Sequence, residues 1–260
     1  MELVGKHALV CGSTQGIGLS TAQLMASRGA RITLVARNEE KLKAALNSLD
    51  TSNNQNHDYL VADFSNPVGL EKTITEFVNS GNTPHILVNN TGGPKGGPII
   101  DANLEEFTST FNQHLICNHI LAQNLYKGMA EMGYGRIINV ISTSVKQPLN
   151  GLGVSNTIRG AVANWSKTLA NELGQFNITV NNVLPGATDT ERLASIAQNK
   201  AAKTGQSEAE VINSMASIVP MKRVGKPEEV ANAIGFLASP AASYINGSNL
   251  PVDGGRTGSL

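Results

Sequence analysis

Short apolar runs recur along the chain and alternate with longer stretches in which apolar and polar residues follow a helical period. The runs are apolar at successive positions, which is typical of strands buried on both faces of a sheet. They predict strands at residues 7–11, 31–36, 59–62, 86–89, 136–141, 178–183 and 248–252. The stretches between them predict helices at residues 17–28, 38–49, 67–79, 104–132 and 154–173. This alternation predicts an α/β fold, in which helices cover both faces of a doubly wound parallel sheet.

The alternation is interrupted after the sixth predicted strand. A loop from Pro185 to Thr190 leads into a helical stretch that is rich in Ala, Lys, Ser and Glu and ends near Ser217. In a doubly wound sheet this position lies beside the carboxyl ends of the strands, where ligands bind. We therefore interpret residues 187–217 as a lid-like segment, and the alternative is a surface excursion with no gating role. Since no linker or repeat divides the chain, residues 1–260 are predicted to form one domain.

Composition excludes several classes of function. Lys and Arg together number 20, as do Asp and Glu, so no charge excess favours nucleic acid or an anionic membrane as a partner. No apolar run approaches the roughly 20 residues that cross a bilayer, and no apolar signal segment is predicted at the start. Cys11 and Cys117 lack the spacing of a zinc site, so no metal is expected. These features favour a cytoplasmic protein that acts on a small-molecule substrate.

A glycine-rich turn joins the first predicted strand to the first predicted helix. Such a turn needs residues without Cβ, so that backbone N–H groups can approach a pyrophosphate at the positive end of the helix. Glycines alone could equally mark a tight turn, but the strand and helix on either side supply the context that a dinucleotide site requires. The predicted cofactor-binding residues of this turn are Gly12, Ser13, Gln15, Gly16, Ile17 and Gly18.

The spacing of these glycines, G-x-x-x-G-x-G, resembles the short-chain dehydrogenase/reductase family. Further motifs of the family follow in order: Asn89–Gly92 after the fourth strand, Leu184–Gly186 after the sixth, and residues 220–229 and 252–255, which are similar to 3-oxoacyl-carrier-protein reductases. The resemblance spans essentially the whole chain. It implies a single-domain Rossmann-type fold, a nicotinamide cofactor and a homotetramer. It also implies that the cofactor is contacted by Asp63, Asn89, Gly92, Pro185, Gly186, Thr188 and Thr190.

The end of the second predicted strand indicates which nicotinamide cofactor is bound. An acidic residue there would bind the ribose hydroxyls of NAD and repel a 2′-phosphate. This chain has Ala36 at that position, followed by Arg37 and Asn38. A guanidinium can bind a phosphate through two hydrogen bonds, and the Ser13 hydroxyl could add another. We therefore favour NADP(H) over NAD(H), and the alternative is that Arg37 is a solvated residue at the start of a surface helix.

The catalytic positions depart from the family. Its reductases typically use a serine, a tyrosine and a lysine, with an asparagine on the helix after the fourth strand. Alignment through Gly135–Ser142 retains the serine as Ser142, whereas the tyrosine and lysine fall on Ser155 and Arg159. The asparagine falls on His114. The resemblance is therefore to a divergent branch of the family that lacks the Tyr-x-x-x-Lys pair.

These replacements limit the chemistry. The Ser155 hydroxyl is a far weaker acid than a phenol, so it cannot simply replace the tyrosine as proton donor. Arg159 stays protonated, so it can hold the ribose or stabilise negative charge but cannot exchange protons. The proton could come from His114, because histidine has a reference pKa near ~6.5, or from Lys146 after Ser142. Alternatively, His114 only fills the space of the asparagine and Lys146 is a solvated loop residue.

Three functions are compatible with this set of residues. The first is an NADP(H)-dependent oxidoreductase that reduces a carbonyl or enone with a non-standard proton donor. Hydride addition to an enone gives an enolate, which Ser142, Arg159 and Lys146 could stabilise as fixed donors. The second is a catalytically impaired dinucleotide-binding protein, acting as a sensor or as the partner of another reductase. The third, a 3-oxoacyl-carrier-protein reductase, conflicts with the missing tyrosine and lysine.

The cofactor preference gives the first testable prediction. Arg37→Glu replaces the cation at the 2′-phosphate with an anion that repels it, so NADPH binding should weaken far more than NADH binding. The measurement is the dissociation constant of each cofactor for the wild type and the variant, by fluorescence titration. Equal losses for both cofactors would contradict the assignment.

Overall fold

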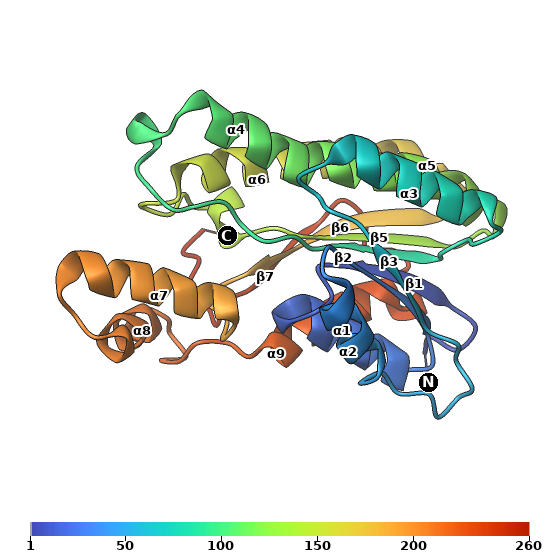
Figure 1. Cartoon of the computed structure of the whole chain (residues 1–260), viewed down its shortest axis with the longest axis horizontal. Coiled ribbons are helices and arrows are strands. Elements are labelled where there is room, and N and C mark those ends of the chain that lie inside the picture. The colour runs from blue at the N-terminus through green and yellow to red at the C-terminus, as the bar shows by residue number, and fades with distance from the viewer. Residues whose placement is uncertain (1, 260) are drawn as a thin grey trace.

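The computed structural model describes residues 2–259, and within them the strands form one parallel sheet between two layers of helices (Figure 1). The strands are β1 His7–Cys11, β2 Arg31–Ala36, β3 Asp58–Val61, β4 Ile86–Asn89, β5 Gly135–Val140, β6 Ile178–Pro185 and β7 Asn249–Val252. The helices are α1 Gly16–Ser27, α2 Glu39–Leu46, α3 Pro67–Asn79, α4 Leu104–Phe111, α5 Cys117–Glu131, α6 Gly153–Leu173, α7 Glu191–Thr204, α8 Glu208–Ser217 and α9 Pro227–Ala238.

The strands are ordered β3-β2-β1-β4-β5-β6-β7, and every neighbouring pair is parallel. Strand β1 lies inside the sheet because the chain first adds β2 and β3 on one side of it and then adds the remaining strands on the other. All five residues of β1 are buried, as a strand covered by helices on both faces requires. The predicted single-domain, doubly wound α/β fold is confirmed.

Each face of the sheet packs its own hydrophobic core. On one face α1, α2 and α9 cover a cluster that includes Ala8, Val10 and Leu34 (Figure 1). On the opposite face α3, α5 and α6 cover a cluster that includes Leu9 and Leu87. Alternate residues of β1 therefore enter opposite cores, which is why its apolar run is continuous.

Two helical regions differ from the prediction. The helix predicted over residues 104–132 contains a π-helical turn, Asn112–Ile116, which separates α4 from α5. Helix α9 is not predicted by the pattern, although its start carries a clear signal. Pro227 occupies the first turn of α9, and the Glu229 carboxylate accepts a hydrogen bond of 2.8 Å from the backbone N–H of Lys226.

A row of asparagines links four neighbouring strands. Asn89, Asn139, Asn182 and Asn249 occupy paired positions in β4, β5, β6 and β7. The side-chain amide of Asn89 donates to the Oδ1 of Asn139 at 2.8 Å, and Asn139 donates to the Oδ1 of Asn182 at 3.0 Å. Asn182 donates in turn to Asn249 at 2.8 Å. Since the first three residues are almost fully buried, these bonds replace water for groups that would otherwise be left unpaired.

Asn139 is the central residue of this row, so we expect Asn139→Ala to reduce the free energy of unfolding by about 2–4 kcal/mol. The variant leaves the amide of Asn89 and the carbonyl oxygen of Asn182 without their partners, and each unpaired buried group is costly. Urea unfolding at pH 7 measures the loss. Asn164→Ala, at an exposed position of α6, is the matched control and should change stability by less than about 0.5 kcal/mol. Equal stability of the two variants would contradict a structural role for the row.

Candidate active site

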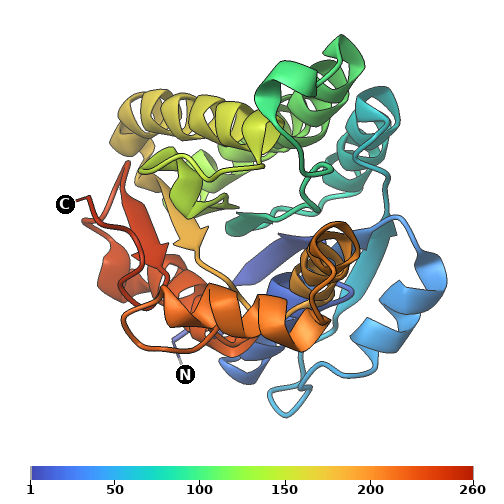
Figure 2. The ribbon, with the colours of Figure 1, turned by 90° about the vertical axis from the view of Figure 1, so that its left-hand side faces the viewer.

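The chain reverses its direction of strand addition between β1 and β4, and the carboxyl ends of these strands border the crevice where doubly wound folds bind ligands. The glycine turn follows β1, and Asn90–Gly93 follows β4. Ser142 follows β5, and the loop from Gly186 to Thr190 follows β6. Figure 2 views the molecule from the side on which α7 and α8 lie, with these two helices in front of the sheet. The fold therefore gathers the predicted cofactor and catalytic segments at one edge.

The glycine turn is packed too tightly for side chains. Gly12 and Gly16 have φ angles of 59° and 53°, in the left-handed region that favours glycine. A Cβ on Gly12 would lie 2.4 Å from the carbonyl oxygen of Asn90, and one on Gly18 would lie 2.1 Å from that of Gly12. The side-chain amide of Asn90 donates to Gly12 O at 3.2 Å. The end of β4 thus holds the turn in place.

Of the remaining residues of the turn, Ser13 bonds to the sheet and Gln15 is exposed at the surface. Ser13 is fully buried, and its Oγ accepts a hydrogen bond of 3.0 Å from the backbone N–H of Val35 in β2. The hydroxyl therefore fastens the turn to β2, and its hydrogen bond to a phosphate remains a prediction. Gln15 is exposed and precedes α1 without a side-chain cap, while Ile17 is half-buried in the first turn. The first N–H groups of α1 can therefore bind an anion.

The residues predicted at the adenine end lie at the ends of β2 and β3. Arg37 and Asn38 are exposed, and the Asn38 Oδ1 accepts from the N–H of Lys41 at 2.8 Å to cap α2. Asp63 is also exposed, and its carboxylate accepts from the N–H of Ser65 at 2.9 Å. That hydrogen bond, together with the nearby charge of Arg37, lowers the pKa of Asp63. A cation and a carboxylate thus flank the place where the adenosine would bind.

Arg159 and Ser155 lie one turn apart on α6, so their side chains share a face of that helix. Arg159 is 7% exposed, and its Nη1 donates to the carbonyl oxygen of Val140 at the end of β5, 3.0 Å away. Ser142 follows two residues later, and its Oγ accepts from the N–H of Ser144 at 3.1 Å. The guanidinium and the retained serine therefore lie beside the same strand end.

His114 lies in the π-helical turn and is 1% exposed. Its Nδ1 forms a hydrogen bond of 2.5 Å with the Oγ1 of Thr91, and its Nε2 is buried without a partner among residues 2–259. Burial, followed by the charges of Arg159 and Arg192, lowers the pKa of His114 to about 2. The expected donor with a pKa near ~6.5 is therefore wrong for this site. The imidazole is neutral near pH 7 and can act only as a hydrogen-bonding group.

Lys146 lies next to the retained serine. It ends the 3-10 turn Thr143–Val145, and its backbone N–H donates to the carbonyl oxygen of Thr143 at 3.0 Å. The side chain is half-buried. Of the two proton donors that the sequence suggests, Lys146 therefore remains, and it lies close to Ser142 in the chain.

The loop after β6 joins the lid-like segment to the glycine turn. Thr188 is buried, and its hydroxyl donates to the carbonyl oxygen of Gly186 at 3.2 Å. Thr190 begins α7 by accepting from the N–H of Leu193 at 3.4 Å. The methyl group of Thr190 would lie 3.1 Å from a Cβ on Gly16. The base of the segment therefore contacts the predicted phosphate turn.

The other predicted cofactor contacts lie around this crevice. Asn89 and Thr188 are buried, and Pro185, Gly186 and Thr190 are half-buried. A Cβ on Gly186 would lie 2.8 Å from the Cα of Asp253, so the loop packs closely on the chain that follows β7. Gly92 has no atom within 4 Å of its Cβ position, so the backbone there borders open space.

Arg192 is a site residue that the motifs do not single out. It lies in the first turn of α7, and its guanidinium donates to the carbonyl oxygen of Pro94. A Cβ on Gly93 would lie 3.4 Å from its Nη2. Arg192 thus links α7 to the loop after β4. Its position two residues after Thr190 is the signal in the sequence that could have identified it.

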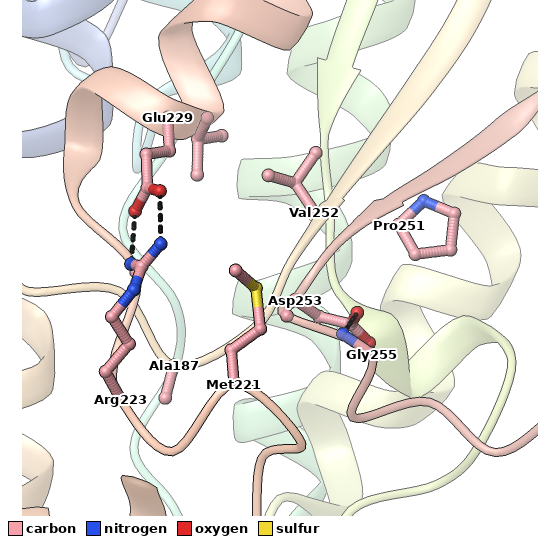
Figure 3. A pocket seen from close by; sticks show the side chains of 11 residues that line it. Ala187, Met221, Arg223, Glu229, Pro251, Val252, Asp253 and Gly255 are labelled. Atoms are coloured by element: carbon pink, nitrogen blue, oxygen red, sulfur yellow. Dashed lines mark hydrogen bonds and ion pairs between the residues drawn. The ribbon is translucent and has the colours of Figure 1, made fainter.

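A hollow of about 260 Å³ lies behind the base of the lid-like segment (Figure 3). Met221 and Val252 line it, together with a paired Arg223 and Glu229. The guanidinium and carboxylate of this pair form two hydrogen bonds, of 2.6 and 2.7 Å. None of the predicted catalytic residues lines this hollow. Its charged pair joins Arg223, in the segment before α9, to Glu229 in the first turn of that helix.

Metal binding and membrane insertion are the other functions on which the described residues bear. Within residues 2–259, no three His, Cys, Asp or Glu side chains lie together as a metal-binding group. In the same part of the chain, every helix is too short or too polar to span a membrane.

Comparison with known proteins identifies the family. A model described as "Enoyl-(Acyl carrier protein) reductase" matches residues 12–257. The chain is 32% identical over 253 residues to the 3-oxoacyl-[acyl-carrier-protein] reductase FabG of Chlamydia trachomatis, which covers 97% of this chain and 98% of the relative. The chain belongs to the short-chain dehydrogenase/reductase family. The resemblance expected from its motifs is confirmed.

Two further relatives match this chain over almost their whole length. The chain is 29% identical to the NADPH-dependent reductase BacG of Bacillus subtilis, over 98% of this chain and 99% of the relative. The structure of L-sorbose reductase from Gluconobacter frateurii, complexed with NADPH and L-sorbose, superposes with a TM-score of 0.93. The sorbose reductase is 34% identical to this chain, and the match covers 100% of this chain and 99% of the reductase. The short-chain fold is thus continuous through the lid-like segment.

The low pKa of His114 gives a prediction about stability. The unfolded chain binds a proton at histidine near pH 6.5, whereas the folded chain binds one at His114 only near pH 2. Stability therefore falls as the pH drops below about 6.5, and His114 should account for about 2 kcal/mol of the loss between pH 7 and pH 5. Urea unfolding of the wild type and His114→Asn at both pH values measures this share. An equal loss in both proteins would show that His114 is not held neutral.

Proposed function

We propose that this protein is an NADPH-dependent reductase that acts on a small carbonyl or enone without the tyrosine and lysine of its family. The observation that carries the proposal is the buried guanidinium of Arg159, which lies beside the retained Ser142 at the end of β5. The named activities of the relatives support it, because BacG is an NADPH-dependent reductase and the sorbose reductase was solved with NADPH.

The residues of the crevice fit such a cofactor. The uncapped start of α1 would bind the pyrophosphate, and the close approach of Gly12 and Gly18 keeps the backbone accessible there. The exposed Arg37 would bind the 2′-phosphate, since Ala36 places no carboxylate against it. Thr188 and Thr190, on the loop after β6, would hold the nicotinamide end. When bound, NADPH supplies the hydride.

The protein groups around the reacting atoms would stabilise negative charge. Ser142 can donate its hydroxyl, because its Oγ accepts from Ser144 and its own proton remains free for a substrate oxygen. Arg159 keeps a full charge at neutral pH, although burial and the charge of Arg192 lower its pKa to about 10. Donors fixed in a water-poor site stabilise a developing oxyanion more strongly than water does.

This set of donors suits an enone better than a simple ketone. Reduction of a ketone requires a proton on the carbonyl oxygen as hydride arrives, and Ser155 is too weak an acid to supply it. Hydride addition to an enone instead gives an enolate, which Ser142 and Arg159 can hold until carbon is protonated. His114 is neutral and buried, so Lys146 or water remains as the proton source.

The remaining features of the assignment follow from the family. We propose that residues 187–217 act as a lid, because Arg192 connects α7 to the loop after β4 across the crevice. We also propose a homotetramer, in which α5, α6 and β7 would pack against other copies. The exposed Phe176 and Tyr244 are compatible with such contacts.

The proposal predicts that Arg159→Ala lowers kcat for an enone such as cyclohex-2-enone by about 10²–10³-fold, as for the loss of one oxyanion donor. The dissociation constant of NADPH should change much less, since the cofactor keeps its phosphate contacts. Steady-state oxidation of NADPH at 340 nm and fluorescence titration measure the two quantities. Lys167→Ala on the same helix is the matched control for loss of a cation and should retain wild-type turnover.

Two further results test the same assignment. A tenfold lower kcat for Lys146→Ala, with unchanged KM, would identify the lysine as the proton source, and an unchanged kcat would assign that step to water. NADPH binding with no oxidation by any ketone or enone would contradict the reductase and favour a dinucleotide-binding sensor.

A further inference from the structure

Two arginines from distant parts of the chain lie beside the buried imidazole of His114. Arg159 comes from α6, and Arg192 comes from the first turn of α7. Each is close enough to His114 for its charge to lower the pKa of the imidazole, and Arg192 also lowers the pKa of Arg159. Arg159 bonds to Val140 at the end of β5, whereas Arg192 bonds to Pro94 in the loop after the neighbouring strand β4, where Thr91 bonds to His114. The two guanidinium groups therefore lie at adjacent strand ends.

Neither guanidinium is neutralised by a carboxylate. Arg159 bonds to the carbonyl oxygen of Val140, and Arg192 bonds to that of Pro94. No ion pair involves either arginine within residues 2–259, although other arginines there, such as Arg28 and Arg223, form ion pairs. Two cations that share one region without an anion repel each other, and the burial of Arg159 increases the cost.

The surroundings add to this positive potential. Arg192 lies at the start of α7, where the helix dipole is itself positive and favours an anion over a cation. The Nε2 of His114 is buried without a partner among the described residues, so one more polar group at this place lacks a hydrogen bond to residues 2–259. An anion with several oxygen atoms would relieve the repulsion and could pair with these donors.

We propose that Arg159 and Arg192 form an anion subsite that holds a carboxylate of the substrate, so that the enzyme reduces carboxylate-bearing carbonyl or enone compounds. This inference rests on the proposed reductase function. The phosphates of the cofactor have the same chemistry and are the other possible occupant. The subsite lies toward His114 and the Gly93–Pro94 loop, however, whereas the pyrophosphate belongs at the glycine turn beside Thr190. This placement favours the substrate.

The test compares two probes that share one enone and end either in a carboxylate or in a neutral methyl ester. The probes are (E)-4-oxopent-2-enoate and its methyl ester, measured with the wild type, Arg192→Gln and Arg192→Lys. The wild type should prefer the acid, and Arg192→Gln should lower the acid-to-ester ratio of kcat/KM on the order of 10–100-fold, as expected for the loss of a charged hydrogen bond. Arg192→Lys should recover part of the ratio. Lys200→Gln, which removes an exposed cation from the same helix, should leave it unchanged.

The affinity for NADPH distinguishes a substrate carboxylate from a cofactor phosphate as the anion in the subsite. If Arg192→Gln leaves the dissociation constant of NADPH within about threefold of the wild type while the ratio falls, the anion is the carboxylate of the substrate. A tenfold weaker NADPH complex with an unchanged ratio would overturn the proposal and assign Arg192 to the cofactor. Equal turnover of acid and ester by the wild type would also overturn the subsite, while leaving the reductase intact.

A binding measurement keeps the subsite testable if the reductase proposal fails. If the wild type oxidises NADPH with neither probe, calorimetric titration of the acid into the NADP⁺-loaded protein shows whether the subsite binds a carboxylate. Binding of the acid that Arg192→Gln weakens would support the subsite without turnover. Failure of the acid to bind, or equal binding by both proteins, would overturn it.

Discussion

The close contact between the glycine turn and the end of β4 is the constraint on which the rest of the site depends. A Cβ on Gly18 would overlap the carbonyl oxygen of Gly12, and one on Gly12 would overlap the backbone of Asn90. This contact aims the uncapped start of α1 into the crevice where the order of the strands reverses. It also fixes where a dinucleotide can lie, and therefore which loops face its reactive end. The proposed catalytic positions, after β5 and on α6, and the loop after β6 are arranged around that place.

The chemistry at the far end of the crevice depends on a second constraint, the buried guanidinium of Arg159, which has no carboxylate partner among residues 2–259. Burial, followed by the charges of Arg159 and the exposed Arg192, keeps His114 neutral, so the histidine cannot act as a charged acid. The same two charges would suit an oxyanion and a carboxylate. In the proposed reaction, the missing phenol and the guanidinium of Arg159 would act together, because an enolate needs fixed positive charge more than it needs an acid at oxygen.

The strands and the cofactor turn can be predicted from the sequence, because buried parallel strands produce continuous apolar runs and the turn requires glycine at fixed positions. Helix α9 is missed, although Pro227 and Glu229 mark its start. The direction of the Ser13 hydroxyl depends on β2, and the pKa of His114 depends on burial and on Arg192. Neither can be predicted from local spacing, since each depends on segments that only the fold brings together. The same reason explains why Arg192 does not stand out in the sequence.

We propose that hydride transfer in this crevice takes place without a tyrosine. The most direct test uses NADPH deuterated at C4 and cyclohex-2-enone, followed by NMR of the product. The account predicts deuterium at the β-carbon of a saturated ketone and a solvent proton at the neighbouring α-carbon. Deuterium that stays on the bound cofactor, or that enters only the carbinol carbon of an allylic alcohol, would contradict it.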